Sequence, residues 1–399
     1  MSIRRRARRP FPPTRDTVSD TEIHVVDSIA DIDAGQWNAL AGQNPFVQHA
    51  FLVAMHATGC ATAKTGWQPH YLLMHRAGVL AGAMPLYLKS HSRGEYVFDH
   101  SWADAFQRHG VDYYPKLLGA VPFTPVTGPR LLAADHDDRV LLARAAIQLA
   151  RQLAVSSLHV LFPAEQDIAA MSEAGYMLRE GVQFHWQNDG YASFDAFLAT
   201  MNQQKRKKVK QDRRHVHDAG ITFRHLRGAE IDTATLDFFY GCYENTYAEH
   251  WNPPYLTRRF FQRLHGTQPE SILLVIAERD GQPIACALDV IGGGIMYGRY
   301  WGTREFVSGL HFETCYMQGI DYCIAQGLTA FEGGAQGVHK MSRGLLPTPT
   351  WSAHWIADAR FADAIGEFLD AETSAMDRHI EELEAHTPFK KAGGPPAET

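Results

Sequence analysis

The sequence contains no long apolar run. Its best candidate, Val79–Leu88, carries Gly82 and Pro85 and is much shorter than the ~20 residues of a membrane-spanning helix. The arginine-rich start, Arg4–Arg9, is followed by polar and proline-containing residues where a secretory signal would need an apolar stretch. We therefore expect a cytoplasmic protein without a membrane span, in which residues 1–19 form a disordered basic tail.

Cysteine is also scarce. The five cysteines, at positions 60, 242, 286, 315 and 323, form no Cys-x-x-Cys pair and are odd in number. This pattern argues against a disulfide framework and against a cysteine-rich zinc site. His215 and His217 are two residues apart, so on a helix they would point to opposite sides and make a poor metal pair. We expect no bound metal and no bound cofactor.

Three common catalytic motifs are missing. The sequence has no Gly-x-Ser-x-Gly and no His-Glu-x-x-His motif, and Gly334–Lys340 lacks the glycine that directly precedes the lysine of a phosphate-binding loop. These absences argue against a serine hydrolase, a zinc protease and a P-loop nucleotidase. The net charge of -6 gives no overall reason to expect nucleic-acid binding, although a local basic cluster can act independently of the total.

The chain does contain enough apolar material for two domains. Its 399 residues are 45% hydrophobic and 21% charged, which is a globular composition. A chain of this length usually divides into two or three domains. We predict domains over residues 20–190 and 191–388. We also predict a disordered tail over residues 389–399, because its Gly-Gly-Pro-Pro composition does not order.

A weak internal duplication supports this division. In each half, three passages of strand length with glycine turns precede a helix, a short strand and a final strand containing a His-Trp pair. The first half contributes Tyr71–Gly78, Ala81–Leu88, Glu95–Trp102, Asp137–Leu153, Leu158–Phe162 and Phe184–Gln187. The second contributes Leu273–Gly281, Ile284–Val290, Met296–Trp301, Leu310–Gln326, Leu328–Glu332 and Ala353–Ile356. This order resembles the GNAT acyltransferase fold; two unrelated α+β domains are the alternative.

A long amphipathic helix is predicted from Ser193 to Ala219. Its later part, Lys205–Arg214, holds seven Lys or Arg among ten residues, so like charges repel one another unless an anion is bound. The negative end of the helix dipole would favour positive charge there. A solvated face is the alternative; we favour a bound polyanion such as tRNA, a nucleotide pyrophosphate or the phosphates of coenzyme A. The expected contacts are Lys205, Arg206, Lys207 and Lys208.

Motifs along most of the chain carry a family resemblance. They are Asn44–Phe46, Pro85–Lys89, Gly94–Asp99, Tyr114–Leu118, Pro122–Arg130, Gly298–Gly302, Leu310–Glu313, Gly334–Gly337 and His339–Lys340. From about residue 22 to about residue 370 the sequence resembles the FemAB-like family of peptidoglycan biosynthesis or recognition proteins. The resemblance implies an α/β (α+β) fold of two tandem GNAT-like domains. One departure is Val338, which stands where relatives carry a glutamate.

The strongest local candidate site lies around the end of the strand Leu328–Glu332. Acyl transfer to an amine needs a base, a stabilised oxyanion and a held donor. Glu332 ends an apolar strand, and burial beside His339 would give it a pKa suited to taking a proton from an ammonium group. Glu332 and His339 are therefore the predicted catalytic residues. The predicted substrate-binding residues are Arg299, Glu313, Gln336, Lys340 and Arg343.

Simpler structural roles are open for each of these residues. Glu332 could form an ion pair with Arg343 that stabilises a loop, and Glu313 could be a first-turn acid that suits the helix dipole. Alternation along a strand places Arg299 and Trp301 on one face, and Trp301 fits the core better than a substrate groove. The absence of Arg-x-x-Gly-x-Gly/Ala, the coenzyme A signature of many GNAT enzymes, counts against acetyl-CoA as donor.

The resemblance implies N-acyl transfer similar to that of Fem-type ligases, which move an amino acid from aminoacyl-tRNA to a cell-wall peptide amine. We expect transfer of an acyl or aminoacyl group, with acyl-CoA or aminoacyl-tRNA as co-substrate, to a small-molecule or peptide amine. The alternative is a non-catalytic protein that binds glycan, peptide or RNA on a degenerate GNAT scaffold.

Overall fold

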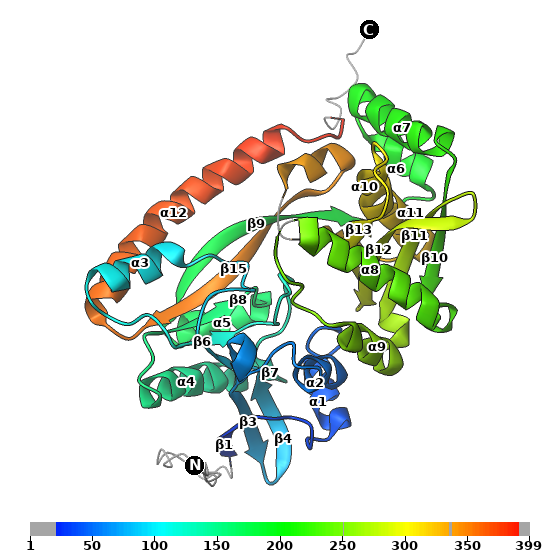
Figure 1. Ribbon diagram of the computed structural model, residues 1–399. Coiled ribbons are helices and arrows are strands. Elements are labelled where there is room, and N and C mark those ends of the chain that lie inside the picture. The colour runs from blue at the N-terminus through cyan, green and yellow to red at the C-terminus, as the bar shows by residue number, and fades with distance from the viewer. Residues whose placement is uncertain (1–20, 250, 335–336, 391–399) are drawn as a thin grey trace. The chain divides into compact units, whose positions relative to one another are not determined.

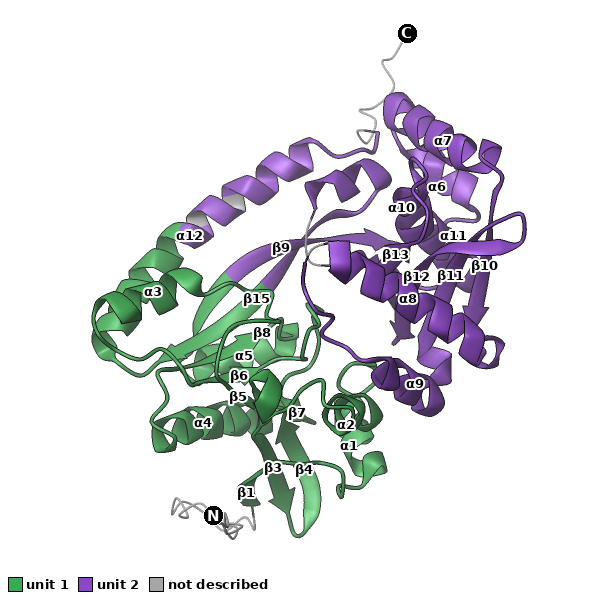
Figure 2. Cartoon of the chain, viewed as in Figure 1, with its two compact units in different colours: residues 1–179, 351–371 green, residues 180–350, 372–399 purple. Residues whose placement is uncertain are grey.

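The computed structural model describes residues 21–249, 251–334 and 337–390 (Figure 1). The chain forms two compact units (Figure 2). Unit 1 comprises the described residues up to 179 together with 351–371, and unit 2 comprises 180–350 together with the described residues from 372. Each unit is discontinuous in sequence, whereas the domains predicted from the sequence are the continuous ranges 20–190 and 191–388. The tails predicted over 1–19 and 389–399 lie outside the described residues, apart from positions 389 and 390.

Unit 1 contains a small antiparallel sheet of strand order β1-β3-β4-β7 and a second run of strands in the order β2-β5-β6-β8-β15. In the second run only β6 and β8 are parallel. The strands are β1 (Thr21–Val26), β2 (Trp67–Pro69), β3 (Tyr71–Arg76), β4 (Val79–Met84), β5 (Tyr87–Lys89), β6 (Lys116–Gly119), β7 (Leu132–Ala133), β8 (Ser157–Leu161) and β15 (Leu346–Ile356), which belongs to unit 1 from Trp351 on. The helices are α1 (Ala34–Ala41), α2 (His49–Ala57), α3 (His100–Arg108), α4 (His136–Gln152) and α5 (Glu165–Glu173), with a short turn η1 (Ala63–Thr65).

The three-stranded meander predicted for the first half is wrong in its later part. The strand expected over Ala81–Leu88 is split, because β4 ends before Pro85, which has no N–H to donate, and β5 joins the other sheet. No strand covers Glu95–Trp102, since α3 begins at His100. Glu95 and Asp99 instead turn inward and bind the buried Lys116 ammonium, which draws this segment over the sheet.

Unit 2 is built on one sheet of strand order β10-β11-β12-β13-β14-β9. All neighbours are antiparallel except β13 and β14, which are parallel. The strands are β9 (Met177–Gln187), which begins in unit 1, β10 (Ile221–Arg227), β11 (Ile272–Arg279), β12 (Gln282–Gly292), β13 (Ile295–Thr303) and β14 (Ala330–Glu332). The helices are α6 (Phe194–Thr200), α7 (Gln203–Asp218), α8 (Thr233–Glu249), α9 (Arg258–Thr267), α10 (Leu310–Phe312) and α11 (Gln318–Gln326), together with the later part of α12 (Ala359–Ala385), whose residues up to 371 belong to unit 1. Short turns are η2 (Gly228–Glu230), η3 (Pro269–Ser271), the π-helical η4 (Glu313–Met317) and the 3-10 η5 (Val338–Arg343). The meander predicted for this half is confirmed as β11-β12-β13.

The two units repeat one strand arrangement, in which a parallel pair is followed by an antiparallel neighbour. In unit 1, β6 and β8 are the parallel pair, and residues Ser352–Ile356 of β15 lie beside β8. In unit 2, β13 and β14 are the parallel pair, and residues His185–Gln187 of β9 lie beside β14. The strand that completes unit 1 therefore comes from late in the chain, which is why the units are discontinuous.

The long helix predicted from Ser193 to Ala219 is two helices. Ser193 caps α6 as expected, but Met201 adopts an extended backbone conformation, and the Asn202 side chain accepts a hydrogen bond from the Lys205 N–H to cap a new helix, α7. The basic segment therefore lies at the start of α7, where the helix dipole is positive, and not near a negative helix end.

Each unit has its own apolar core. In unit 1, Leu142 and Ala146 of α4 pack with Leu72, Leu117 and other strand residues. Residues of α6 and α11 pack with β11, β12 and β13 in unit 2. Over the described ranges, no helix combines the length and apolar character that a membrane crossing requires.

Candidate functional site

A fork between β13 and β14 marks the candidate site in unit 2. The parallel pairing covers three residue pairs and ends at Tyr297 and Glu332. Strand β13 continues to Thr303, and beyond Tyr297 its strand neighbour within the described residues is β12. Gly298 and Gly333 directly follow the last pair, and glycine allows a ligand to approach the backbone closely. We call this place the β13–β14 fork.

A β-bulge lies at the fork. Leu288 pairs with Tyr300 and Asp289 with Gly298, so Arg299 is the extra residue on β13. The bulge interrupts the alternation predicted for Arg299 and Trp301. The Arg299 guanidinium lies 5.3 Å from the centre of the Tyr300 ring, while the Trp301 ring contacts His311 and packs on the core, as expected for Trp301.

Glu332 lies in a row of polar side chains across three strands. Its register partners are Tyr297 on β13 and His185 on β9, so the three side chains share one face of the sheet. We call these residues the Glu332 row. Glu332 is 8% exposed, and its Oε2 atom lies 3.9 Å from His185 Nε2. Burial, together with the positive charge of Lys340, lowers the pKa of His185 to about 4, so a neutral imidazole faces the carboxylate near pH 7.

The histidine beside Glu332 is thus not the predicted one. His339 is exposed on η5, where its ring contacts the rings of Phe312 and Tyr316. Its pKa is lowered by partial burial and by the charges of Lys340 and Arg343. His339 lies on η5, beyond the end of β14, whereas β9 pairs His185 directly with Glu332.

Lys340, which is predicted to bind substrate, has a buried side chain. Its Nζ donates a hydrogen bond to the Gly334 carbonyl at 2.9 Å, and burial lowers its pKa to about 8. Gln336, also predicted to bind substrate, lies outside the described residues.

Arg343 forms its ion pair with α7. Its guanidinium donates to Asp212 at 2.7 Å and lies 4.6 Å from the centre of the Phe312 ring. The ion pair between Arg343 and Glu332, considered as a structural alternative, is therefore not the one formed. Asp212 also accepts from Lys208 at 2.8 Å, so one carboxylate joins η5 to the basic segment of α7.

Glu313 is the first residue of the π-helical turn η4 and is only 4% exposed. Burial raises its pKa, although Arg213 of α7, at 3.1 Å, opposes this rise. Gln318 donates a second hydrogen bond at 2.8 Å. This environment differs from that of a solvated first-turn acid. Single π-helical turns are frequent at functional sites.

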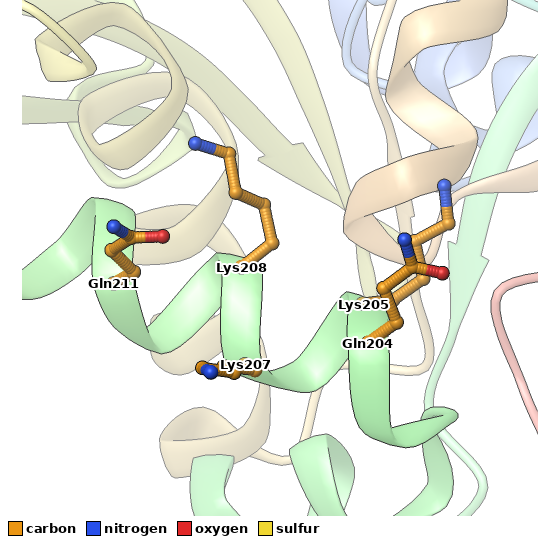
Figure 3. Close-up of a pocket in the computed structure, with 5 residues that line it drawn as sticks. All are labelled: Gln204, Lys205, Lys207, Lys208 and Gln211. Carbon is orange, nitrogen blue, oxygen red and sulfur yellow. The ribbon is translucent and has the colours of Figure 1, made fainter.

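The basic segment of α7 lines a shallow pocket of about 310 Å³ (Figure 3). Its lining residues are Gln204, Lys205, Lys207, Lys208 and Gln211. Among the described residues, no carboxylate forms an ion pair with Lys205, Arg206 or Lys207. Uncompensated ammonium groups at the positive end of a helix dipole favour a bound anion.

The structure therefore brings together most predicted residues on elements of unit 2. Asp212 and Arg213 of α7 contact Arg343 and Glu313, which links the basic segment to η5 and η4. Sequence reasoning missed His185, although its place in the duplicated His-Trp pair was a signal.

Asp289 was also missed. It is the one acid in the apolar strand Ile284–Val290, and its Oδ2 atom has no hydrogen-bond partner within the described residues. Burial raises its pKa to about 8.

Comparisons with known proteins agree with this fold. The model of the FemAB-like family, described as peptidoglycan biosynthesis/recognition, matches residues 28–391. None of the curated proteins matches the sequence. The C-terminal DUF2156 domain of a putative lysylphosphatidylglycerol synthetase from Agrobacterium fabrum is 9% identical, with a TM-score of 0.55 over 86% of this chain and 97% of that one.

FemX is 12% identical, with a TM-score of 0.54 over 84% of this chain and 98% of that chain. A tandem GNAT protein from the clavulanic acid biosynthesis pathway is 14% identical, with a TM-score of 0.42 over 85% and 99%. At these identities the likeness to the DUF2156 domain and to FemX shows a common fold, and the chain has the predicted tandem GNAT-like arrangement.

Proposed function

The chain belongs to the FemAB-like peptidoglycan biosynthesis/recognition family, and we propose that it is an N-acyltransferase whose reaction takes place at the β13–β14 fork. The observation that carries the proposal is the position of Glu332. It is a buried carboxylate at the last residue pair before two parallel strands part, with glycines directly after it.

The chemistry needs few groups. The acceptor nitrogen attacks the acyl carbonyl of the donor, a C–N bond forms, and the bond from the carbonyl carbon to the donor's leaving oxygen or sulfur breaks. Glu332 accepts a proton from the acceptor ammonium before attack, and the second proton that the nitrogen loses as the amide forms passes to the leaving oxygen or sulfur. Neutral His185 and Tyr297 flank the carboxylate on the same sheet face and can orient the amine by hydrogen bonds. Lys340 supplies a positive charge for the anionic part of a substrate.

The α7 pocket supports a polyanionic donor. Lys205, Lys207 and Lys208 line it, and Asp212 connects it with Arg343 of η5. Aminoacyl-tRNA and acyl-CoA both present phosphates to such a surface. The name of the putative lysylphosphatidylglycerol synthetase indicates transfer of a lysyl group, which favours an aminoacyl donor such as aminoacyl-tRNA. The family description favours a cell-wall acceptor, and the carboxylate at the fork favours an amine.

Donor binding can be tested by fluorescence anisotropy with labelled aminoacyl-tRNA across a salt series, and in parallel by competition with an acyl-CoA. For the triple variant Lys205→Gln, Lys207→Gln, Lys208→Gln we expect weaker tRNA binding and a log K versus log salt slope that is smaller by roughly 2 to 3. A matched control is the triple variant Lys64→Gln, Arg108→Gln, Arg144→Gln, which neutralises three exposed charges of unit 1.

Equal losses in both triple variants would show that binding follows net charge and would remove α7 as the donor site. Displacement by acyl-CoA without any tRNA binding would assign coenzyme A thioester as the donor. Tight binding of tRNA without transfer to any amine would favour the non-catalytic alternative.

A further inference from the structure

Two lysines lie in the interior of unit 1. Lys89 on β5 and Lys116 on β6 are direct register partners, and both are 0% exposed. Lys116 Nζ donates hydrogen bonds to Ser92 and Glu95, each at 2.8 Å, and also to Asp99. Two ammonium groups are thus buried side by side.

One segment covers both lysines. Residues Ser90–Asp99, which we call the cover segment, lie between β5 and α3 and form neither helix nor strand. Glu95 and Asp99 point inward to the ammonium groups, while Arg93 and Phe98 of the same segment are exposed. The cover segment therefore lies between the two lysines and the solvent.

The cover segment satisfies these charges incompletely. Lys89 Nζ donates to the Arg93 carbonyl at 3.2 Å and lies 3.7 Å from the centre of the Trp67 ring, but Glu95 Oε1 is 3.8 Å away, too far for a hydrogen bond. Glu95 Oε1 and Asp99 Oδ1 are buried without hydrogen-bond partners among the described residues. Burial lowers the pKa of Lys89 to about 7 in spite of the nearby Glu95.

The fold does not require lysine at this place. When the two His-Trp strands are superposed in register, His159, which pairs with His354, corresponds to Glu332, which pairs with His185. Leu118 then corresponds to Tyr297, and Lys116, two residues earlier, corresponds to Ile295. An apolar residue therefore serves the same strand position in unit 2. Replacing a buried ion pair by apolar residues is often neutral or stabilising, so stability alone does not account for the lysines.

We infer that unit 1 contains a second ligand site, in which Lys89 and Lys116 bind a dianionic group, either a phosphate or a pair of carboxylates, when the cover segment moves aside. In the covered state Glu95 and Asp99 both bind Lys116, and Glu95 Oε1 lies 3.8 Å from Lys89, so displacing them leaves both lysine side chains for a ligand of charge −2. Tyr113 and Tyr114 add hydroxyl groups, which now bind Asp99 and Ser92. This site is separate from the β13–β14 fork and does not depend on the proposed reaction.

Gly94 provides a way to loosen the cover. It has a φ of +82°, and an added Cβ atom would lie 2.6 Å from the Phe123 ring and 3.4 Å from Trp67. Gly94→Ala should therefore disfavour the covered state. If the ligand binds only the uncovered state, a tenfold rise in the fraction of uncovered molecules should raise the apparent affinity by roughly tenfold.

The test is isothermal titration calorimetry of the full chain with inorganic phosphate, and separately with glutarate to distinguish phosphate from dicarboxylate binding. We expect Gly94→Ala to bind one of the two probes about tenfold more tightly than the parent chain, and Lys89→Met, which keeps packing on Trp67, to lose the binding. The triple α7 variant, in which Lys205, Lys207 and Lys208 are glutamine, should retain it, because that change leaves unit 1 intact.

A second variant keeps the test decisive if Gly94→Ala does not fold. Glu95→Gln removes one covering charge without changing the backbone, and it should also strengthen binding. Because the α7 pocket is itself proposed to bind phosphate, Lys89→Met and Glu95→Gln are compared in the background of the triple α7 variant. Binding there that survives Lys89→Met, or no binding of either probe to any folded variant, would overturn the inference.

Discussion

Lys340 is a buried ammonium group whose pKa of about 8 falls within an accessible pH range. Since burial lowers this pKa, the side chain is charged below about pH 8 and loses its proton above it. If the charge holds an anionic substrate, KM should rise by up to roughly tenfold per pH unit above pH 8. Lys340→Arg keeps the charge at every such pH, so its KM should stay flat. The measurement is KM from pH 6.5 to 9.5, and an equal rise in both proteins would contradict this role.

Asp289 should make stability depend on pH. Its pKa is raised to about 8 in the folded chain from an ordinary value of 3.8, so the folded state holds a proton that the unfolded state has released. The stabilisation is complete below pH 4 and is lost as pH rises to about 8, with a slope of up to about 1.4 kcal/mol per pH unit. Asp289→Asn has no proton to lose. Urea unfolding between pH 4 and pH 8 should show a shallower slope in the variant; identical slopes would refute the assignment.

The sequence was informative about which residues are buried and less so about their partners. The apolar strand before Glu332 correctly indicated that the carboxylate is buried. Its neighbour is His185 and not His339, because cross-strand register between distant segments cannot be read from local pattern. The same limit applies to Arg343, whose partner Asp212 lies on α7.

Helix α8 packs on β13 with almost no space between the two backbones. A Cβ atom added at Gly302 would lie 2.0 Å from the Cys242 carbonyl oxygen, and Thr246 and Asn245 of α8 donate to the carbonyls of Trp301 and Thr303. Gly302→Ala must separate the helix from the strand that carries the bulge. We expect a loss of more than about 2 kcal/mol of unfolding free energy.

Gly266 offers a matched control within α9. An added Cβ atom would meet nothing within 4 Å there. Gly266→Ala should be neutral or stabilising by up to about 1 kcal/mol. Urea denaturation of both variants is the measurement, and similar effects at the two positions would contradict the close approach of α8 to β13.

Sequence periodicity predicted helices over Asp137–Leu153, Ser193–Ala219 and Leu310–Gln326 and the meander of unit 2, but it did not predict α1, α2, α3, α5, α8 or α9, and it did not show two interruptions. The apolar pattern of Ser193–Ala219 continues across the break at Met201, where the Asn202 cap decides the outcome. Asn is a favoured N-cap, so this signal was available in the sequence. The missing third strand of the first meander had no such signal, because its cause is the distant Lys116.

On the scale of the whole molecule, unit 1 is completed by residues 351–371 from late in the chain. Ala353 on β15 is fully buried in the core of unit 1, opposite Val160 of β8. Ala353→Glu buries a charge without a partner and should destabilise unit 1 by more than about 3 kcal/mol. Hydrogen exchange should show faster exchange in β8, while β11 in unit 2 keeps its protection.

The exposed substitution Asp363→Asn on α12 is the control and should leave both strands protected. Faster exchange in β11 alone after Ala353→Glu would argue against the division of the chain described above. The duplication in sequence predicted the strand after the helix and the final His-Trp strand of each half, but it missed β6, the parallel partner of β8. It also could not show that the final strand of each half lies beside strands far from it in sequence.

The proposed function is tested most directly by transfer of a labelled group to an amine acceptor, with labelled aminoacyl-tRNA and labelled acyl-CoA as donors and cell-wall precursor peptides as acceptors. The measurement compares kcat for the parent chain, Glu332→Gln and the exposed control Glu165→Gln. We predict that Glu332→Gln lowers kcat by roughly 10²- to 10⁴-fold, with donor binding and melting temperature unchanged, and that Glu165→Gln transfers normally. An unchanged kcat for Glu332→Gln would contradict catalysis at the β13–β14 fork.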